Sequence, residues 1–294
     1  MRRGEAGCPW CDPRIVGGVR ADLHRVEDAD GLLEWAAGEP GRAVGGRVRA
    51  YTGYREDTPS PVYRLETPTG ALTVILSFGD GFRAQTDTAA GQLSAYTSFV
   101  VGMHDRPSPT AHDGRQLGLQ ITLDPPAAFT LLGVPLHELG NRVVELADLV
   151  GDDAECWAGQ LADIPRWPER FALLDRLLAD RMARGPVPSP ALEWAWRTMS
   201  VAGGDVRVAA LAHGAGCSHR HLVAQFREQV GATPKTAARV LRYARAARLL
   251  ARGDLPPGQV AVVCGYADQS HLTREYVSFA GTTPGAAAVT GSIS

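Results

Sequence analysis

The last third of the chain contains an internal repeat of about 50 residues, and this feature constrains the fold most strongly. Residues of the same kind stand 50 positions apart, or 49 for the last two pairs: His221/His271, Leu222/Leu272, Phe226/Tyr276, Gly231/Gly281, Thr233/Thr283, Pro234/Pro284, Ala212/Ala261 and Gly216/Gly265. A fixed period of this length indicates one supersecondary unit that is present twice.

Each copy has the pattern of a helix, a tight turn and a second helix. In the first copy we expect a helix over 206–215, a turn at Gly216, and a helix from the N-cap Ser218 to about residue 230. In the second copy we expect a helix over 257–264, a turn at Gly265, and a helix that starts at residue 267 or 268 and stops at Gly281. This is the pattern of a helix-turn-helix, whose second helix can lie in the DNA major groove.

The segment between the copies, residues 236–252, predicts an amphipathic helix with a cationic face. Arginines recur at every third position: Arg239, Arg242, Arg245 and Arg248. Residues 187–294 hold ten Arg and one Lys against six acidic residues, a net charge of +5, whereas residues 1–186 have a net charge of −7. A solvated surface face and contact with DNA phosphates both explain the arginine series, and the sequence leaves the two alternatives open.

Residues 190–288 resemble the DNA-binding domain of the AraC/XylS transcription regulators. The matching motifs are Leu211-Ala212-x3-Gly216-x-Ser218-x2-His221-Leu222-x3-Phe226-x4-Gly231-x2-Pro234, Arg242-x2-Arg245-Ala246-x-Arg248-Leu249-Leu250, and Val260-Ala261-x3-Gly265-Tyr266-x-Asp268-Gln269-Ser270-His271-Leu272-x-Arg274-x-Tyr276-x4-Gly281-x-Thr283-Pro284. The chain departs from the family at Val277, where the family has a basic residue. The resemblance implies a cytoplasmic, sequence-specific transcription regulator that is not an enzyme, needs no cofactor, and contacts RNA polymerase if it is an activator.

On such a domain, the outer face of each second helix would read bases near its N-terminus. The candidates are His219, Arg220, Val223 and Ala224 in the first unit and Gln269, Ser270, Thr273 and Arg274 in the second. Candidates for phosphate contact are Ser218, Arg239, Arg242 and Arg245. The side chains of Leu222, Phe226, Leu272 and Tyr276 would point inward and form core.

The acidic N-terminal part reads as strands followed by helices. We expect strands over 47–54, 62–66, 71–78 and 117–123, and helices over 31–37, 136–150 and 167–184. The fold class is therefore α+β: a small sandwich or barrel with trailing helices, then an all-α domain with two helix-turn-helix motifs joined by a linker helix. The looser resemblance of this part to the sensor halves of such regulators implies a cupin-like β-barrel. The expected boundaries are a flexible tail over 1–26, a sensor or dimerisation domain over 27–184, a linker over 185–190, and the DNA-binding domain over 191–294.

The looser resemblance to the sensor halves of such regulators implies a small-molecule effector in the barrel. Polar and aromatic candidates for its lining are Tyr51, Tyr54, Tyr63, Arg64 and Glu66, although the sequence does not show which face points inward. The helices over 136–150 and 167–184 could either join two chains in a homodimer or cap the barrel within one chain. A ligand-independent architectural DNA binder, with a front half that only dimerises, is the alternative of another class.

Other chemistry receives less support from the sequence. Cys8 and Cys11 form a C-x-x-C pair that could be a thiol switch or half of a zinc site, but no second pair completes a zinc site, and an incidental thiol pair is the simpler interpretation. An enzyme could use His104-Asp105, His112-Asp113 and Glu138, yet their spacing matches no ligand pattern, and the histidines are expected at the surface. No apolar run reaches the ~18–20 residues that cross a bilayer, and the first residues lack the apolar stretch of a secretory signal.

Overall fold

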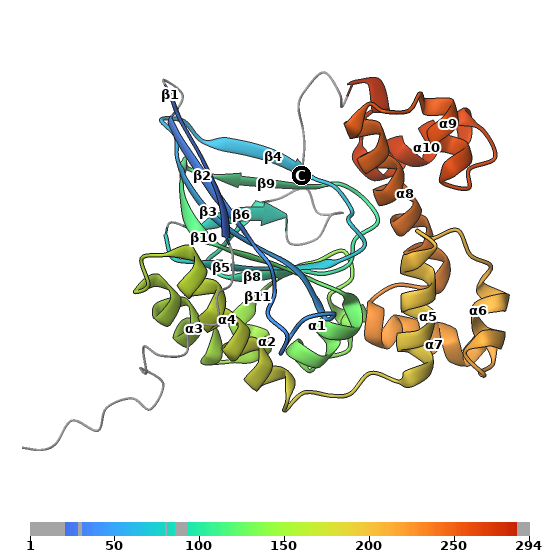
Figure 1. The fold of residues 1–294 in the computed structure, drawn as a ribbon, viewed down its shortest axis with the longest axis horizontal. Coiled ribbons are helices and arrows are strands. Elements are labelled where there is room, and N and C mark those ends of the chain that lie inside the picture. Colours follow the sequence, from blue (N-terminus) through green and yellow to red (C-terminus); the bar gives the residue numbers. More distant parts are fainter. Residues whose placement is uncertain (1–20, 29–30, 80, 86–92, 287–294) are drawn as a thin grey trace, which may run out of the picture.

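The structure is a computed structural model that describes residues 21–28, 31–79, 81–85 and 93–286 (Figure 1). Its N-terminal part holds two β-sheets and the helices α1–α4, and its C-terminal part holds the helices α5–α10. Cys8 and Cys11 lie outside the described residues. Among those residues, no helix combines the length and the apolar character needed to cross a membrane.

Two antiparallel sheets make up the β part. The seven-stranded sheet has the order β1 (Ala21–Asp28), β2 (Gly31–Gly38), β3 (Val48–Asp57), β10 (Arg115–Leu123), β5 (Leu72–Ser77), β8 (Phe99–Val101) and β11 (Val143–Glu145). The four-stranded sheet has the order β4 (Val62–Glu66), β9 (Ser108–His112), β6 (Phe82–Gln85) and β7 (Leu93–Tyr96). The sheets face each other as an open arrangement and not as the closed barrel that we expected.

The two faces of the seven-stranded sheet carry different side chains because neighbouring residues of a strand point to opposite sides. One face packs against helices, and Tyr51, Leu119 and Phe171 of α4 share its core. The other face packs against the four-stranded sheet, where Ile75 and Phe99 meet Ala84 and Tyr96. The space between the sheets is therefore separated from the helices by the seven-stranded sheet.

The helices of the N-terminal part are α1 (Pro125–Leu132), α2 (Leu146–Val150), α3 (Asp153–Ala162) and α4 (Trp167–Met182), with a short 3-10 turn η1 (Leu136–Glu138). The helix expected over 167–184 is confirmed as α4. Its apolar residues Phe171, Leu174 and Leu178 are fully buried against the sheet. Of the two alternatives for this helix, capping the sheet within one chain is therefore the one that the structure shows.

Three expectations for the N-terminal part are wrong. The segment expected as a helix over 31–37 is the strand β2, which lies between β1 and β3 and satisfies its backbone hydrogen bonds on both sides. Residues 21–26, expected in a tail, belong to β1 because they pair with β2. The single helix expected over 136–150 is η1, β11 and α2, since the stretch between them pairs with β8.

The C-terminal part is the expected double helix-turn-helix. Helix α5 (Pro190–Val201) precedes the first unit, which consists of α6 (Val208–Gly214) and α7 (His219–Val230). The second unit consists of α9 (Pro257–Val263) and α10 (Gln269–Ala280), and α8 (Pro234–Arg252) joins the two. Both turns use a glycine at positive φ, 66° at Gly216 and 73° at Gly265, a conformation that costs other residues free energy.

The N-terminal part contacts the first unit directly. Helix α7 packs against α1 and η1, and Met103 lies in the same apolar core as Trp196 and Phe226. Asp124, which precedes α1, accepts hydrogen bonds from Arg49 Nε of β3 (2.7 Å) and from Trp196 Nε1 of α5 (3.2 Å). One carboxylate therefore joins the large sheet to the C-terminal part.

Candidate functional site

The second helix of each unit presents a polar outer face at its N-terminal end. Both helices begin with a side-chain cap: Ser218 Oγ accepts from the amide of His221 (3.2 Å), and Asp268 Oδ1 accepts from the amide of His271 (2.6 Å). The candidate base readers His219, Arg220, Ala224, Gln269, Ser270 and Arg274 are exposed, and Val223 and Thr273 are partly buried. These side chains lie where a major groove could reach them.

The inner faces of the same helices hold the units together. Leu222, Phe226 and Leu272 are fully buried, and Tyr276 is 8% exposed. The expectation that these four residues form core is confirmed. The two helices therefore divide their residues cleanly between packing and an outer face.

Helix α8 places the two units at its opposite ends (Figure 1). At a rise of about 1.5 Å per residue, its 19 residues span about 28 Å. Ser218, a candidate for phosphate contact, is exposed, and Arg245 is partly buried. Arg239 and Arg242 extend from α8 to Glu275 of α10.

An open pocket of about 340 Å³ lies beside these arginines, between α8, α10 and the start of α6. Its charged lining consists of Lys235, Arg239, Arg242 and Glu275. The cationic side chains outnumber the one carboxylate, so the pocket favours an anionic group.

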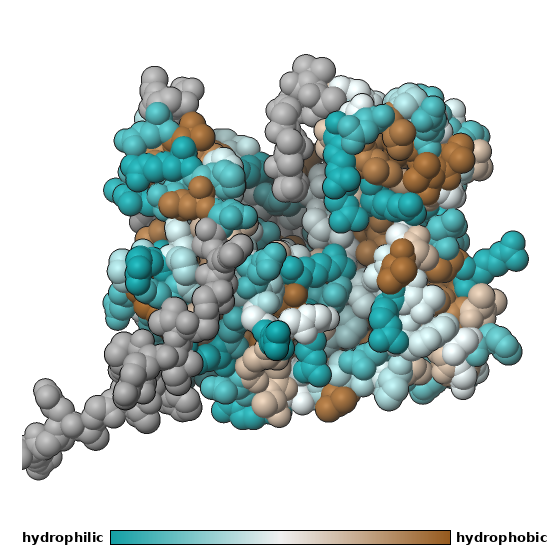
Figure 2. Space-filling model, viewed as in Figure 1, coloured by the Kyte–Doolittle hydropathy of each residue, from teal (hydrophilic) through white to brown (hydrophobic). Residues whose placement is uncertain are grey.

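Val262, Val263 and Val277 of the second unit are exposed, and Figure 2 shows apolar side chains gathered over α9 and α10. Val277 therefore offers no charge to a phosphate.

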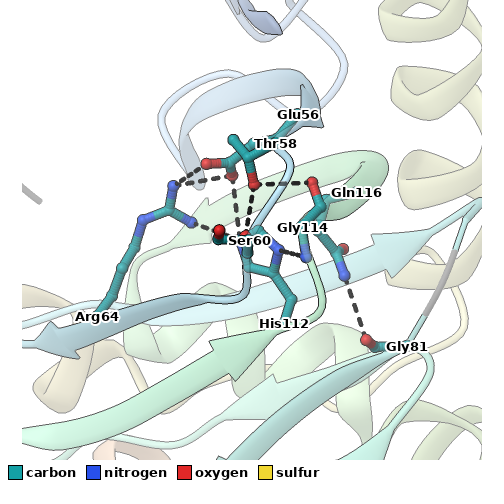
Figure 3. Close-up of polar contacts among 8 residues, drawn as sticks. All are labelled: Glu56, Thr58, Ser60, Arg64, Gly81, His112, Gly114 and Gln116. Carbon is teal, nitrogen blue, oxygen red and sulfur yellow. Dashed lines mark hydrogen bonds and ion pairs between the residues drawn. The ribbon is translucent and has the colours of Figure 1, made fainter. Parts of the chain in front are cut away.

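The space between the two sheets holds a cluster of charged and polar side chains (Figure 3). Glu56 of β3 is 8% exposed and His112 of β9 is 2% exposed. Arg64 Nη2 of β4 donates to both carboxylate oxygens of Glu56, at 2.7 and 2.8 Å. His112 Nδ1 accepts from the amide of Gly114 (3.2 Å), which leaves Nε2 to donate to Glu56 Oε2 at 3.2 Å.

Burial and charge act in opposite directions on the acids of this cluster. Burial works to raise the pKa of Glu56, but the hydrogen bond from His112 and the pair with Arg64 outweigh it, and the pKa is lowered. Burial raises the pKa of Glu66, against the charge of Arg64 and a hydrogen bond with Thr110. Burial likewise raises the pKa of Tyr54, whose hydroxyl is enclosed with no hydrogen-bond partner in the described part of the chain.

Comparison with known proteins identifies the C-terminal part. The sequence model of a family described as a helix-turn-helix domain matches residues 211–288. Residues 211–288 therefore match a helix-turn-helix domain, a motif that places its second helix in the DNA major groove. No curated protein matches the chain.

Solved structures similar to the chain include ToxT from Vibrio cholerae, at 10% identity over 83% of this chain and 98% of that chain, with a TM-score of 0.48. An AraC-type DNA-binding domain protein from Chromobacterium violaceum is 24% identical over 34% of this chain and 91% of that chain, with a TM-score of 0.33. A probable AraC family regulator from Rhodopseudomonas palustris is 22% identical over 36% of this chain and 100% of that chain, with a TM-score of 0.32.

The five candidates for an effector site do not lie together. Tyr54, Arg64 and Glu66 belong to the space between the sheets. Tyr51 lies on the other face of β3, where its hydroxyl donates to Asp175 Oδ1 of α4 (2.8 Å). Tyr63 is 73% exposed because it follows the opposite alternation to Arg64 along β4. Neither Tyr51 nor Tyr63 lines the space.

Sequence reasoning missed Glu56 as a candidate and placed His112 at the surface. His112 is instead buried on β9, and His104 is 8% exposed. The spacing of Tyr54 and Glu56, two residues apart on one strand, could have placed both on one face. No local pattern could have paired Glu56 with His112, because their contact depends on how two separate sheets face each other.

Proposed function

We propose that the chain is a sequence-specific transcription regulator that inserts α7 and α10 into two successive major grooves on one side of a DNA duplex. The observation that carries the proposal is the pair of exposed helix faces at the two ends of α8. The charge of +5 over residues 187–294 favours binding to the phosphate backbone.

In this proposal the side chains divide into base readers and phosphate contacts. Arg220 and Arg274 suit a guanine edge, Gln269 suits adenine, and Val223 and Ala224 suit a thymine methyl group. His219, Ser270 and Thr273 complete the reading faces. Ser218, Arg245 and the η nitrogens of Arg239 and Arg242 contact phosphates, since the contacts to Glu275 use the ε nitrogens of both arginines.

Selection of bound sequences from a random DNA pool at ~150 mM salt tests this function, because that ionic strength screens non-specific contacts. We expect a site with two half-sites about one helical turn apart. Absence of any enriched sequence, both with the protein alone and with a small-molecule mixture, would contradict sequence-specific binding.

We propose further that a small polar effector binds between the two sheets. The orphaned hydroxyl of Tyr54 supports this site, because a buried polar group without a partner is costly unless a ligand or water satisfies it. A thermal-shift screen of polar metabolites tests the site, with Tyr54→Phe as the matched variant. A compound that stabilises the wild type more than this variant, and that changes operator affinity, supports it. Operator affinity that no stabilising compound changes favours the ligand-independent architectural binder.

A homodimer and RNA polymerase are further partners in the proposal. Since α4 uses its apolar face within one chain, a dimer would need another surface. Sedimentation of the protein with and without operator DNA tests the dimer. Transcription from a promoter that carries the operator tests whether the regulator acts on RNA polymerase.

A further inference from the structure

A buried ion pair connects the linker helix to the second unit. Glu275 of α10 has a side chain that is only 5% exposed. Arg239 Nε of α8 donates to Glu275 Oε1 at 2.7 Å, and Arg242 Nε donates to Glu275 Oε2 at 3.4 Å. One carboxylate is therefore held by two successive turns of α8.

Aromatic rings of the second unit also contact the same two arginines. The guanidinium of Arg239 lies 5.1 Å from the centre of the Phe279 ring, and that of Arg242 lies 5.0 Å from the Tyr266 ring. Burial, followed by the nearby Glu275 carboxylate, raises the pKa of Tyr266. The second unit thus contacts α8 through one carboxylate and two aromatic rings. These contacts specify both the distance and the angle between α10 and α8.

The first unit is attached to α8 in a different way. Ala237, Ala238 and Leu241 of α8 belong to one apolar core with residues of α5, α6 and α7. The second unit also packs apolar residues on α8, including Tyr243 and Phe279. Apolar packing is non-directional, whereas a two-armed ion pair has a defined geometry. A buried ion pair contributes little net stability, and its best-attested role is to fix register.

We propose that Glu275 is a positioning residue that sets the orientation of α10 relative to α8, and thereby the distance between half-sites that the regulator accepts. This inference rests on the proposed reading of two successive grooves. One base pair moves a half-site by about 3.4 Å along the duplex and about 35° around it. A rigid second unit cannot follow such a rotation without losing base contacts, so the spacing preference reports how firmly α10 is held.

The experiment measures the affinity of the full chain for duplexes that carry both selected half-sites at the preferred spacing and at one base pair more or less. Duplexes with only the first or only the second half-site complete the set. In the wild type we expect each spacing change to weaken binding by about tenfold, the value of roughly one base contact. In Glu275→Gln, which keeps the shape and removes the charge, we expect that ratio to fall below about threefold.

Two controls separate positioning from other roles. Arg274→Ala removes a proposed base reader, so it should weaken binding at all three spacings and leave their ratio unchanged. Glu275→Asp keeps the charge and should restore part of the spacing preference. Affinity of Glu275→Gln for the second half-site alone should stay within about twofold of the wild type, because the reading face is intact.

Each other outcome has a definite meaning. A wild-type spacing ratio in Glu275→Gln would overturn the inference and leave the proposed function standing. Loss of both the spacing preference and the affinity for the second half-site alone would show that Glu275 maintains the fold of the second unit. That result would also overturn the inference. A wild type without any two-part site would refute the proposed function itself.

Discussion

Removal of the Glu56 carboxylate should destabilise the N-terminal part more than removal of an exposed carboxylate on the same sheet. In Glu56→Ala, His112 loses the acceptor of its Nε2–H group, and Arg64 loses a two-armed partner. His112 is 2% exposed, so water cannot easily replace the lost acceptor. Arg64 has a side chain that is 43% exposed and can turn to solvent.

The two losses differ in size for that reason. A buried donor left unsatisfied costs about 1–3 kcal/mol. The half-exposed arginine pair is screened by water, so it adds at most about 1 kcal/mol. We therefore expect Glu56→Ala to lower the free energy of unfolding by about 1–4 kcal/mol. The control Glu27→Ala removes a carboxylate that is 65% exposed and pairs with Arg25, and should change it by no more than about 0.5 kcal/mol.

The difference in free energy of unfolding between Glu56→Ala and the wild type should depend on pH. The folded protein holds the pKa of Glu56 below its ordinary value of 4.5. Between the folded and unfolded pKa values the unfolded chain binds more protons, so stability rises with pH through that interval. The contribution of Glu56 is therefore complete above about pH 4.5 and is lost as the pH falls through the folded pKa.

Urea unfolding followed by tryptophan fluorescence measures these differences at pH 7 and at pH values below 4.5. We expect a gap between wild type and Glu56→Ala that is largest at pH 7 and narrows in acid. Equal stability of the two proteins at pH 7 would refute the argument from the buried donor. A gap of constant size at all pH values would refute the argument from the lowered pKa.

Three further predictions concern other parts of the molecule. Arg274→Ala should weaken operator binding by about 1–3 kcal/mol and relax the base preference at one position of the selected site. Titration against the operator and its single-base variants measures this preference, and an unchanged preference would contradict the assignment. Tyr51→Phe should lower the free energy of unfolding by about 1 kcal/mol, because it removes a hydrogen bond to Asp175. It should leave the thermal shift caused by an effector unchanged, since Tyr51 faces the helices. Loss of that thermal shift in the variant would contradict an effector site between the two sheets. Burial lowers the pKa of His104, so the free energy of unfolding should decline as the pH falls below the ordinary value of 6.5. In His104→Leu the free energy of unfolding should change less between pH 7 and pH 5 than in the wild type. An equal dependence on pH in the two proteins would contradict this prediction.

The helix-turn-helix units were predictable because their signals are local. Each recognition helix has a capping side chain at its start, Ser218 or Asp268, and a glycine at its end, Gly231 or Gly281. These signals act within one or two turns of the chain, so they require no knowledge of distant partners. The repeat doubled the information, since each copy supported the interpretation of the other.

The strand β2 was not predictable in the same way. Its residues Leu32, Leu33, Glu34, Ala36 and Ala37 are good helix formers, and a helix was the reasonable expectation from propensity alone. Pairing with β1 and β3 along its length outweighs propensities that amount to a few tenths of a kcal/mol per residue. Tertiary pairing of this kind is invisible in the sequence of the segment itself.

The effector candidates show a related limit of sequence reasoning. The alternation of a strand indicates that Tyr51 and Tyr54 point to opposite faces of β3, but it does not show which face the helices cover. In the structure α4 covers the face of Tyr51, and the four-stranded sheet covers the face of Tyr54. The identity of the inward face thus depends on how β3 packs against other elements, of which α4 follows it by more than a hundred residues.

The two units differ in their contacts with the rest of the chain. The first unit shares an apolar core with Met103 and is joined to the large sheet through Asp124 and Trp196. Core packing transmits displacement stiffly, so the first unit moves with the N-terminal part. The second unit is held to α8 by Glu275, in a geometry that two hydrogen bonds define. Contacts of different kinds therefore join the two units to the rest of the chain: an apolar core and Asp124 at the first unit, and the ion pair at Glu275 with the packing of Tyr243 on Phe279 at the second.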